Sequence, residues 1–457
     1  MKQSILSPLY NQSLIVDLYE LTMAAGYFSN SYNYESTFEL FIREMPPQRS
    51  FLVAAGLQQV MEYLTHLKFG SEELDYLRNL PTFKNVDKKF WEYLENFRFT
   101  GDVWGIPEGQ IVFAGEPLLR VTAPMIEAQV IETFALSMIN FQTLIASKAA
   151  RVVHAAELDG KKRGVMEFGS RRAHGPEASA LAARASYLAG CAGTSNVLAG
   201  QRYGIPALGT AAHSWTMAFP GEVEAFRAYH NVFPDSTVLL IDTYDIEQGA
   251  RNAVKIGKSV KGVRIDSGDL DTESRKVREI LDAAGMKDTQ IVASGDLNEH
   301  KIKKLVEAGA PIDSFGVGTQ MATSADAPYL GGIYKLVEQR IKGETLFRAK
   351  FSENKATYPA KKQIYRIIDE RGNYLRDIIG RGSENISEKH TELLVPVIRQ
   401  GKLVYEFPEL KESREFFHRN LARLERRYKE FDSPDNFPVT YSRNLQDLFD
   451  KLKEEET

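Results

Sequence analysis

Short apolar runs alternate with amphipathic stretches through the middle of the chain. Each run is rich in β-branched and other apolar residues, and most of the stretches between them have helical periodicity. Strands that alternate with helices of about 10–15 residues are typical of βαβ units and a parallel sheet. The runs that predict strands lie at residues 164–168, 191–194, 207–210, 238–241, 260–265, 290–293 and 314–317.

Polar residues follow every one of these predicted strands, at a spacing of roughly 25 residues. An open sheet would collect its ligands at one switch point, so the pattern favours an irregular or incomplete parallel α/β barrel. The motif at residues 267–270, Ser-Gly-Asp-Leu, recurs at residues 294–297. We therefore expect a duplicated βα unit, with helix N-caps at Asp271 and Asn298.

The two ends of the chain have a different pattern. The N-terminal part predicts a helix near residues 16–27 and a strand at 36–42. The C-terminal part predicts antiparallel strands and a long amphipathic helix, at residues 345–351, 363–368, 393–399 and 412–432. We expect a flanking α+β domain built from both ends. The predicted segments are an N-terminal α+β segment (1–135), the barrel domain with the active site (136–343) and a C-terminal cap (344–457).

Composition narrows the possible partners. The chain has 57 Lys and Arg against 61 Asp and Glu, a formal net charge of −4 that argues against a nucleic-acid partner. Polar residues interrupt the most apolar stretch, 125–146, so we expect no transmembrane helix. Cys191 is the single cysteine, which excludes an intramolecular disulfide and a cysteine-cluster metal site. A reduced, cytoplasmic protein is expected.

The first candidate site lies at residues 168–176, where Phe168 precedes Arg171 and Arg172 and a helix is predicted from Pro176. Paired guanidinium groups before a helix N-terminus can bind a carboxylate or a phosphate. The alternative is a pair of salt-bridged surface arginines, which we consider the weaker interpretation.

His213 is the second candidate. A lone histidine among alanines is often a packing or capping residue, but Asp242 could hold one imidazole nitrogen and leave the other free for nucleophilic or acid–base chemistry. The sequence alone leaves these two interpretations equally open.

The remaining candidates are small polar loops. Asp266 and Asp296, each beside a glycine-containing turn, could approach sugar hydroxyls or hydrated Mg²⁺, although a capped βα turn is the simpler explanation of either loop. Residues 316–319, Gly-Val-Gly-Thr, could present backbone N–H groups to a phosphate. Residues 193–196 could form a turn or a site wall. Together the candidates imply a phosphorylated sugar and a small anion.

The order of these motifs resembles the nicotinate phosphoribosyltransferase family over nearly the whole chain. The resembling segments are residues 17–23, 168–176, 209–215, 242–245, 264–269 and 316–319. The resemblance implies an enzyme of NAD biosynthesis that condenses nicotinate with phosphoribosyl pyrophosphate and releases pyrophosphate. It further implies a C–N bond formed with coupled ATP hydrolysis, Mg²⁺, and a homodimer with shared active sites.

The resemblance also implies roles for individual residues. Phe168 would stack on the pyridine ring, Tyr19 of the neighbouring subunit would cover its other face, and Arg171 would meet the substrate's acidic group. His213 would be phosphorylated transiently, with Asp242 as its carboxylate partner. The sugar-phosphate residues would be Arg264 and Asp266 at the ribose and pyrophosphate (Asp266 also as a possible Mg²⁺ contact), Gly295 and Asp296 at the ribose hydroxyls, and Gly318 and Thr319 at the 5′-phosphate. His174 departs from the motif, where glutamine is common.

Three alternatives remain. In the similar nicotinamide phosphoribosyltransferases an aspartate matches Ser195, and such an aspartate would repel the carboxylate of nicotinate, so Ser195 favours nicotinate. A phosphosugar isomerase or aldolase would explain the aspartates and the 316–319 loop, but not Phe168 with Arg171, and no lysine marks a predicted strand end. A catalytically inactive nicotinate-binding regulator would not need His213 and Asp242.

Overall fold

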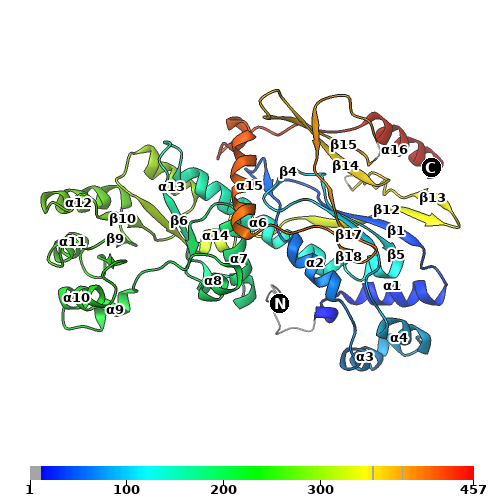
Figure 1. The fold of residues 1–457 in the computed structure, drawn as a ribbon, viewed down its shortest axis with the longest axis horizontal. Helices are drawn as coiled ribbons and strands as arrows, with labels where there is room; N and C mark the ends of the chain where they lie inside the picture. The colour runs from blue at the N-terminus through cyan, green and yellow to red at the C-terminus, as the bar shows by residue number, and fades with distance from the viewer. Residues whose placement is uncertain (1–11, 353–354, 383, 457) are drawn as a thin grey trace. The chain divides into compact units, whose positions relative to one another are not determined.

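The computed structural model describes residues 12–352, 355–382 and 384–456, which form two compact units. Unit 1 combines the chain up to Leu144 with the chain from Tyr329 onward, and unit 2 is Ile145–Pro328 (Figure 1). The prediction that both ends of the chain build one flanking α+β domain is confirmed.

Unit 1 contains a seven-stranded sheet built from both ends of the chain, with three central strands from before unit 2 and two strands from after unit 2 on each side of them. The strand order in the described residues is β13-β12-β1-β5-β3-β17-β18. β1 lies between β5, which follows it in the first part of the chain, and β12, which comes after unit 2. The bounds are β1 Glu35–Ile42, β3 Asp102–Gly105, β5 Pro117–Pro124, β12 Gly332–Ile341, β13 Glu344–Phe347, β17 Val395–Arg399 and β18 Lys402–Leu403.

Helices cover an extensive apolar core in unit 1, and its first helix is α1, Leu18–Ser29. The stretch Met125–Ala156, which contains α5 and α6, could span a membrane by length and composition alone, contrary to the expectation from its polar interruptions. However, 61% of its most apolar window is buried inside the structure, as in a core helix. The further helices are α2 Leu57–His66, α3 Ser71–Arg78, α4 Lys88–Glu95, α5 Met125–Gln129, α6 Glu132–Ala156, α15 Leu410–Arg423 and α16 Arg443–Glu456, with short 3₁₀ turns at Gln12–Leu14, Pro81–Phe83 and Arg426–Lys429.

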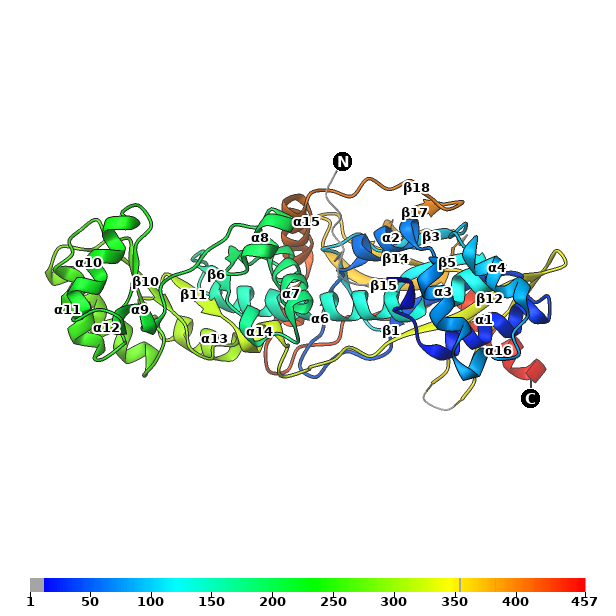
Figure 2. The ribbon, with the colours of Figure 1, turned by 90° about the horizontal axis from the view of Figure 1, so that it is seen from below.

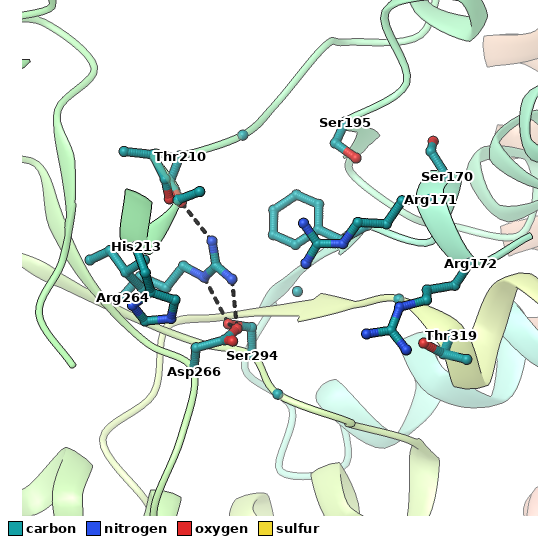
Figure 3. Close-up of a pocket in the computed structure, with 18 of the residues that line it drawn as sticks. Ser170, Arg171, Arg172, Ser195, Thr210, His213, Arg264, Asp266, Ser294 and Thr319 are labelled. Carbon is teal, nitrogen blue, oxygen red and sulfur yellow. Dashed lines mark hydrogen bonds and ion pairs between the residues drawn. The ribbon is translucent and has the colours of Figure 1, made fainter. Parts of the chain in front are cut away.

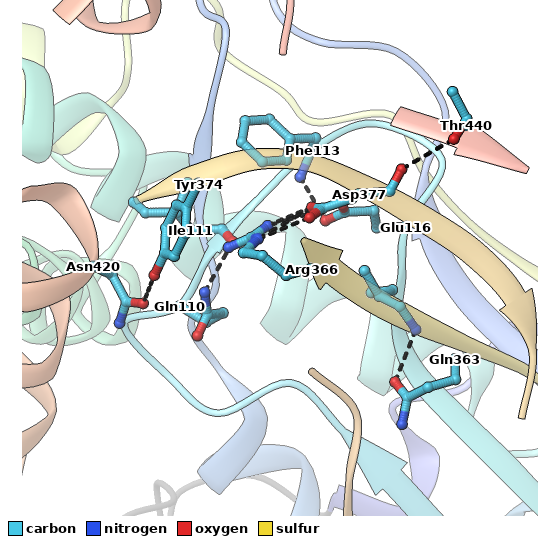
Figure 4. Close-up of polar contacts among 11 residues, drawn as sticks. Gln110, Ile111, Phe113, Glu116, Gln363, Arg366, Tyr374, Asp377, Asn420 and Thr440 are labelled. Carbon is cyan, nitrogen blue, oxygen red and sulfur yellow. Dashed lines mark hydrogen bonds and ion pairs between the residues drawn. The ribbon is translucent and has the colours of Figure 1, made fainter. Parts of the chain in front are cut away.

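A smaller sheet of unit 1, in the order β16-β14-β15-β19, carries a fully buried ion pair. Arg366 on β14 donates to both carboxylate oxygens of Asp377 on β15, and its guanidinium lies 4.5 Å from the centre of the Tyr374 ring (Figure 4). Glu116 lies beside them, and its burial and the nearby Asp377 raise its pKa well above the ordinary value. The bounds are β14 Lys362–Ile368, β15 Tyr374–Arg381, β16 His390–Glu392 and β19 Val439–Tyr441, and a separate two-stranded sheet joins β2 Leu52–Val53 to β4 Ile111–Val112.

The long C-terminal helix predicted at residues 412–432 is wrong in length. α15 ends at Arg423 because Leu424 is extended, and a 3₁₀ turn follows at Arg426–Lys429. Three of the apolar residues that suggested one continuous helix are nevertheless buried: Phe417, Leu424 and Tyr428 are at most 2% exposed.

Unit 2 is built on a curled, six-stranded parallel sheet, in the order β7-β6-β11-β10-β9-β8 among the described residues. It forms an incomplete barrel, as predicted, and both views show α9 to α12 gathered near β10 (Figures 1 and 2). The strands are β6 Gly164–Glu167, β7 Gly193–Thr194, β8 Val238–Leu240, β9 Gly262–Ile265, β10 Gln290–Ala293 and β11 Ser314–Val317. The helices are α7 Pro176–Leu188, α8 Val197–Tyr203, α9 His213–Met217, α10 Glu222–Val232, α11 Ile246–Val254, α12 Leu270–Ala283, α13 Glu299–Glu307 and α14 Thr319–Ala322, with a 3₁₀ turn at Ser170–Arg172.

Two local predictions for unit 2 are corrected. Residues 207–210 are not a strand, because only Ala207 forms an isolated bridge, to Thr194. In the first copy of the repeated motif the helix N-cap is Asp269, which accepts from the Thr272 N–H at 2.9 Å, rather than Asp271. The second predicted cap is confirmed, since Asn298 accepts from the Lys301 N–H at 2.9 Å.

Candidate active site

A cavity of about 480 Å³ opens at the carboxyl ends of the parallel strands of unit 2. Loops that follow β6, β7, β9, β10 and β11 line it, together with the segment that leads into α9 (Figure 3). The carboxyl edge of a parallel sheet is the usual position of ligand sites in such folds. The predicted site residues that line the cavity are Phe168, Arg171, Ser195, His213, Arg264, Asp266, Gly295, Asp296, Gly318 and Thr319.

The Phe168 ring is fixed at one wall of this cavity by the neighbouring strand. Its backbone N–H donates to the Val317 carbonyl at 2.8 Å, which continues the pairing of β6 with β11. The ring occupies the space that a side chain at Gly316 would fill, because a Cβ there would lie 2.6 Å from two ring carbons. The Arg264 guanidinium lies 5.7 Å from the ring centre. The ring is thus held against β11 with a cation nearby.

Arg171 and Arg172 contribute two uncompensated positive charges. Both are exposed on the 3₁₀ turn that follows Phe168, and their guanidinium groups extend into the cavity, Arg172 beside Thr319 (Figure 3). In the part of the chain that the structure describes, neither forms an ion pair with a carboxylate. The interpretation as a salt-bridged surface pair is therefore wrong, and both groups are available to an anionic ligand.

Arg264, in contrast, is held by three neighbours. It donates to Thr210 Oγ1 and Ser294 Oγ, each at 2.8 Å, and to Asp266 Oδ1 at 2.6 Å (Figure 3). Ser294 also donates to Asp266 Oδ1 at 2.5 Å. Burial alone would raise the pKa of Asp266, but these hydrogen bonds from Ser294 and Arg264 hold it below its ordinary value. Asp266 is therefore ionised at neutral pH, and the pair is fixed before any ligand binds.

His213 is the first residue of α9 and lines the cavity, half-buried. Its Nδ1 is 3.3 Å from Thr243 Oγ1. Asp242, its expected partner, instead accepts through Oδ2 from the Asp266 N–H at 2.9 Å and the Ser267 hydroxyl at 2.6 Å. Asp242 Oδ1 is buried without a hydrogen-bond partner in the described residues. Asp242 thus fixes the loop after β9 while one of its oxygens stays unsatisfied.

The two copies of the repeated motif, at residues 267–270 and 294–297, place their aspartates differently. In the second copy Asp296 is exposed at the cavity in the left-handed region, with φ +46°. The preceding Gly295 has φ +99° and no space for a side chain, because a Cβ would collide with the Asp266 carbonyl. Lys301 Nζ donates to the Asp296 carbonyl at 2.9 Å. The corresponding Asp269 of the first copy is the helix cap, so only the second copy of the motif places its own aspartate at the cavity.

Tyr19 belongs to unit 1, on α1, and does not line the cavity of unit 2. Its side chain is 45% exposed despite its apolar character. Partial burial and the nearby Glu132 raise its pKa above the ordinary value, so the phenol is neutral. His174 is exposed in the loop before α7 and does not line the cavity.

Sequence reasoning missed several supporting residues. Thr210 and Ser294 lie in the motifs at residues 209–215 and 294–297, but the motifs did not predict that they accept hydrogen bonds from Arg264. Arg172 was paired with Arg171 without a role of its own. Glu167, buried directly before Phe168, received no attention. A carboxylate at the end of an apolar strand was the available signal, because a buried charge needs polar partners.

Metal binding in this cavity would depend on few protein ligands. Within the described residues no group of three or more His, Cys, Asp or Glu side chains is placed to hold a metal ion. Asp266 and Asp296 are the carboxylates that line the cavity, and Asp242 accepts hydrogen bonds from the loop that carries Asp266. One or two carboxylates suit Mg²⁺, which is commonly held by that number together with substrate phosphates.

Comparison with known proteins gives a consistent result. Family models of the nicotinate phosphoribosyltransferase N-terminal domain, the nicotinate phosphoribosyltransferase family and its C-terminal domain match residues 14–140, 164–370 and 386–449. A nicotinate phosphoribosyltransferase of Mycobacterium tuberculosis is 42% identical over 453 residues, covering 97% of this chain and 95% of that protein. One of Bacillus subtilis is 38% identical and covers 94% and 93%.

A solved structure agrees with these relatives. Human nicotinic acid phosphoribosyltransferase superposes with a TM-score of 0.84 at 28% identity, over 96% of this chain and 100% of that one. The matched family models together extend over most of the chain and include the residues of both units. This chain therefore belongs to the nicotinate phosphoribosyltransferase family.

Proposed function

We propose that this protein is a nicotinate phosphoribosyltransferase that joins nicotinate to phosphoribosyl pyrophosphate with coupled ATP hydrolysis. The observation that carries the proposal is one cavity lined by the Phe168 ring, by the Arg171 guanidinium without a counterion among the described residues, and by the loops that carry Asp296 and Thr319. An aromatic face with an adjacent cation suits a flat, anionic heterocycle. The remainder of the cavity offers groups for a ribose and its phosphates.

The nicotinate subsite would lie between Phe168 and Arg171. The ring would stack on Phe168, and its carboxylate would accept hydrogen bonds from Arg171. Ser195, exposed on the opposite loop, adds no negative charge to this wall. The pyridine nitrogen has a free lone pair, so the reaction needs no general base, and orientation is the main contribution of this subsite.

The phosphoribosyl pyrophosphate subsite would extend from Asp296 to Thr319. Asp296 would accept from the ribose hydroxyls, while Thr319, Gly318 and the guanidinium of Arg172 would bind the 5′-phosphate. Arg264, which also lines the cavity, would face the pyrophosphate. The pyridine nitrogen forms a bond to the ribose C1 as the C1–O bond to pyrophosphate breaks, and positive groups stabilise the departing charge.

Mg²⁺ would enter with the pyrophosphate, and Asp266 and Asp242 are the side chains that could contact it or its water shell. When bound, Mg²⁺ would neutralise charge on the leaving group. The buried, unsatisfied Asp242 Oδ1 is the feature of this site that fits an additional donor or cation.

ATP coupling would use His213. With Nδ1 directed to Thr243, Nε2 is the nitrogen free to attack the γ-phosphorus of ATP. An N–P bond would form as the bond between the β- and γ-phosphates breaks and ADP leaves, and water would later return the phosphoryl group to phosphate. The charge of a phosphorylated His213 would alter the affinity of the neighbouring pyrophosphate subsite.

The second face of the nicotinate ring would be covered by Tyr19 of another subunit. This part of the proposal requires a homodimer and agrees with a large aromatic side chain left 45% exposed on α1.

The decisive experiment is a product assay with nicotinate, phosphoribosyl pyrophosphate and ATP, each omitted in turn. Nicotinate mononucleotide should form only when nicotinate and phosphoribosyl pyrophosphate are both present, and ATP should stimulate it. Nicotinamide in place of nicotinate should give a far lower kcat/KM. Comparable turnover of nicotinamide would contradict the assignment of the substrate.

A further inference from the structure

We propose that Glu167 and Thr194 form a positioning clamp that sets the width of the nicotinate subsite. The inference rests on the proposed function, because it concerns the two loops that would hold the nicotinate ring. One loop follows β6 and carries Phe168 and Arg171, and the other follows β7 and carries Ser195.

The Glu167 carboxylate joins these two loops directly. Glu167 is the last residue of β6 and is 1% exposed. Its Oε1 accepts from the backbone N–H of Gly169, within the Phe168 loop, and its Oε2 accepts from the Thr194 hydroxyl at 2.6 Å. Its backbone carbonyl accepts from the Ser195 N–H at 2.9 Å. Side chain and backbone of one residue therefore hold both sides of the subsite.

Hydrogen bonds of Thr194 and Asn196 connect Glu167 to the start of α8. Its hydroxyl accepts from the Asn196 N–H at 3.0 Å while it donates to Glu167. Asn196 in turn caps α8 by accepting from the Ala199 N–H at 2.9 Å, and it donates to Ser179 Oγ at 3.0 Å. Ser195 lies between two residues that are both fixed, although its own side chain is exposed at the cavity.

The carboxylate oxygens of Glu167 accept hydrogen bonds from the two loops and do not bind a cation of the described residues. Among the described residues no lysine or arginine pairs with it, and burial raises its pKa. Each carboxylate oxygen has a donor from a different loop, so shortening or removing the side chain breaks both side-chain links at once, while the backbone bond to Ser195 remains. Burying a carboxylate without a counterion costs free energy. We infer that Glu167 is present nevertheless because its length holds the two loops at a fixed separation.

The test compares Thr194→Val with Thr194→Ser. Valine keeps the shape of threonine but removes the hydroxyl, whereas serine keeps the hydroxyl. We expect Thr194→Val to raise the KM for nicotinate at least tenfold and the KM for phosphoribosyl pyrophosphate less than threefold, with Thr194→Ser within twofold of the wild type. An unchanged KM for nicotinate in Thr194→Val, or equal losses for both substrates, would overturn the clamp.

Unit 1 offers a matched control. There Thr100 donates to the buried Glu127 carboxylate at 3.0 Å through its hydroxyl. Thr100→Val removes a hydrogen bond of the same kind at a residue that does not line the cavity, and it should leave both KM values unchanged. If it shifts the KM for nicotinate as much as Thr194→Val does, the effect is one of general stability and the clamp is refuted.

If Thr194→Val does not fold, a comparison of Glu167→Gln with Glu167→Asp tests the same proposal. The amide can accept from Gly169 and donate to Thr194, so the span between the loops is kept, and the KM for nicotinate should change less than threefold. Glu167→Asp keeps the charge but is too short to reach both donors, and it should raise that KM at least tenfold. The reverse order of these two variants would overturn the spacer role.

Failure of the clamp and failure of the proposed function give different results. A wild-type protein that makes no nicotinate mononucleotide refutes the function, whatever the variants do. A wild type that makes it, with variants that bind nicotinate equally well, refutes only the clamp.

Discussion

At the residue scale, the cavity contains two kinds of arginine. Arg264 has three protein partners and 13% of its side chain exposed, whereas Arg171 and Arg172 extend into the cavity without a counterion among the described residues. A fixed arginine costs little reorganisation when charge develops on a ligand, and a free one gains a partner only when the ligand arrives. The two kinds should therefore respond differently to substitution.

Arg171→Ala should raise the KM for nicotinate about 10- to 100-fold, because a hydrogen bond between charged groups contributes about 1.5–3 kcal/mol. The KM for phosphoribosyl pyrophosphate should change much less. Arg172→Ala is the matched comparison and should show the opposite preference, since Arg172 lies beside Thr319. Steady-state kinetics with each substrate varied in turn would measure both. Identical profiles for the two variants would contradict the separate assignments.

His213→Ala should abolish ATP hydrolysis that depends on nicotinate and phosphoribosyl pyrophosphate, while some ATP-independent product formation remains. The reason is that the imidazole would accept the phosphoryl group but takes no part in the bond between pyridine and ribose. Release of phosphate and formation of nicotinate mononucleotide can be measured in the same reaction. Equal coupling in variant and wild type would remove His213 from this role.

The residue types at the site were readable from the sequence, but their pairing was not. Phe168, Arg171, His213 and Asp296 were all singled out, and the cavity brings them together. The hydrogen bond expected between His213 and Asp242 is not formed. Asp242 accepts instead from Ser267 in the loop after β9, and the imidazole of His213 lies within hydrogen-bond distance of the Thr243 hydroxyl. Such choices depend on side-chain directions that spacing along the chain does not determine.

At the element scale, glycines in the strands of unit 2 decide how closely side chains approach the sheet. Gly316 on β11 leaves the space that the Phe168 ring occupies. Gly164 on β6 has only ordinary contacts, with its nearest neighbour 3.6 Å from the position of a Cβ.

Gly316→Ala should displace the Phe168 ring and lower the kcat/KM for nicotinate at least tenfold, since small misplacements of a bound ring are costly. Gly164→Ala, in a neighbouring strand of the same sheet, should remain within about twofold of the wild type. Kinetics and a thermal unfolding curve for each variant provide the measurement. A normal kcat/KM in Gly316→Ala would show that the ring position is not needed.

α1 contributes a pH-dependent term to the stability of unit 1. Burial raises the pKa of Glu20 to about 7, against an ordinary value of 4.5, and Thr133 donates to its carboxylate from backbone and hydroxyl. The native chain therefore retains a proton that the unfolded chain releases between these values. The free energy of unfolding should fall by roughly 1–3 kcal/mol as the pH rises from 4.5 to 7.

Glu20→Gln should remove this part of the pH dependence. The comparison is best made in a Trp215→Phe background, because Trp91 and Trp104 then report on unit 1 alone. Urea unfolding followed by fluorescence at several pH values would give the free energies. Parallel pH profiles with and without Glu20 would contradict the assignment.

Elements with a clear period were predictable, and those that depend on distant partners were not. The parallel strands were found because apolar runs and helices alternate. Residues 207–210 have a strand-like composition but lie beside β7, a strand of only two residues, so just one bridge forms. The duplicated motif was also visible, yet one copy caps a helix and the other faces the cavity, because φ differs at the aspartate.

At the scale of the whole molecule, a site shared between subunits can be tested by mixing inactive variants. Tyr19→Ala and Asp296→Ala should each be inactive or nearly so. If Tyr19 acts in trans, hybrids of the two contain one intact site out of two. Random mixing should then restore about a quarter of the wild-type activity. No recovery after subunit exchange, or a fully active monomer by light scattering, would contradict the shared site.

The seven-stranded sheet of unit 1 has a consequence for biosynthesis, because the strands that flank its centre come from the end of the chain. When the ribosome has translated the chain as far as Pro328, β1 has β5 beside it but lacks β12 on its other side, since β12 begins at Gly332. Unit 2 by then has its complete sequence and can close first. Until β12 is made, the N-terminal strands form a sheet with an unpaired edge at β1, and such an edge promotes aggregation. Premature termination after Pro328 should therefore yield an insoluble product, even though every strand of the parallel sheet has been made.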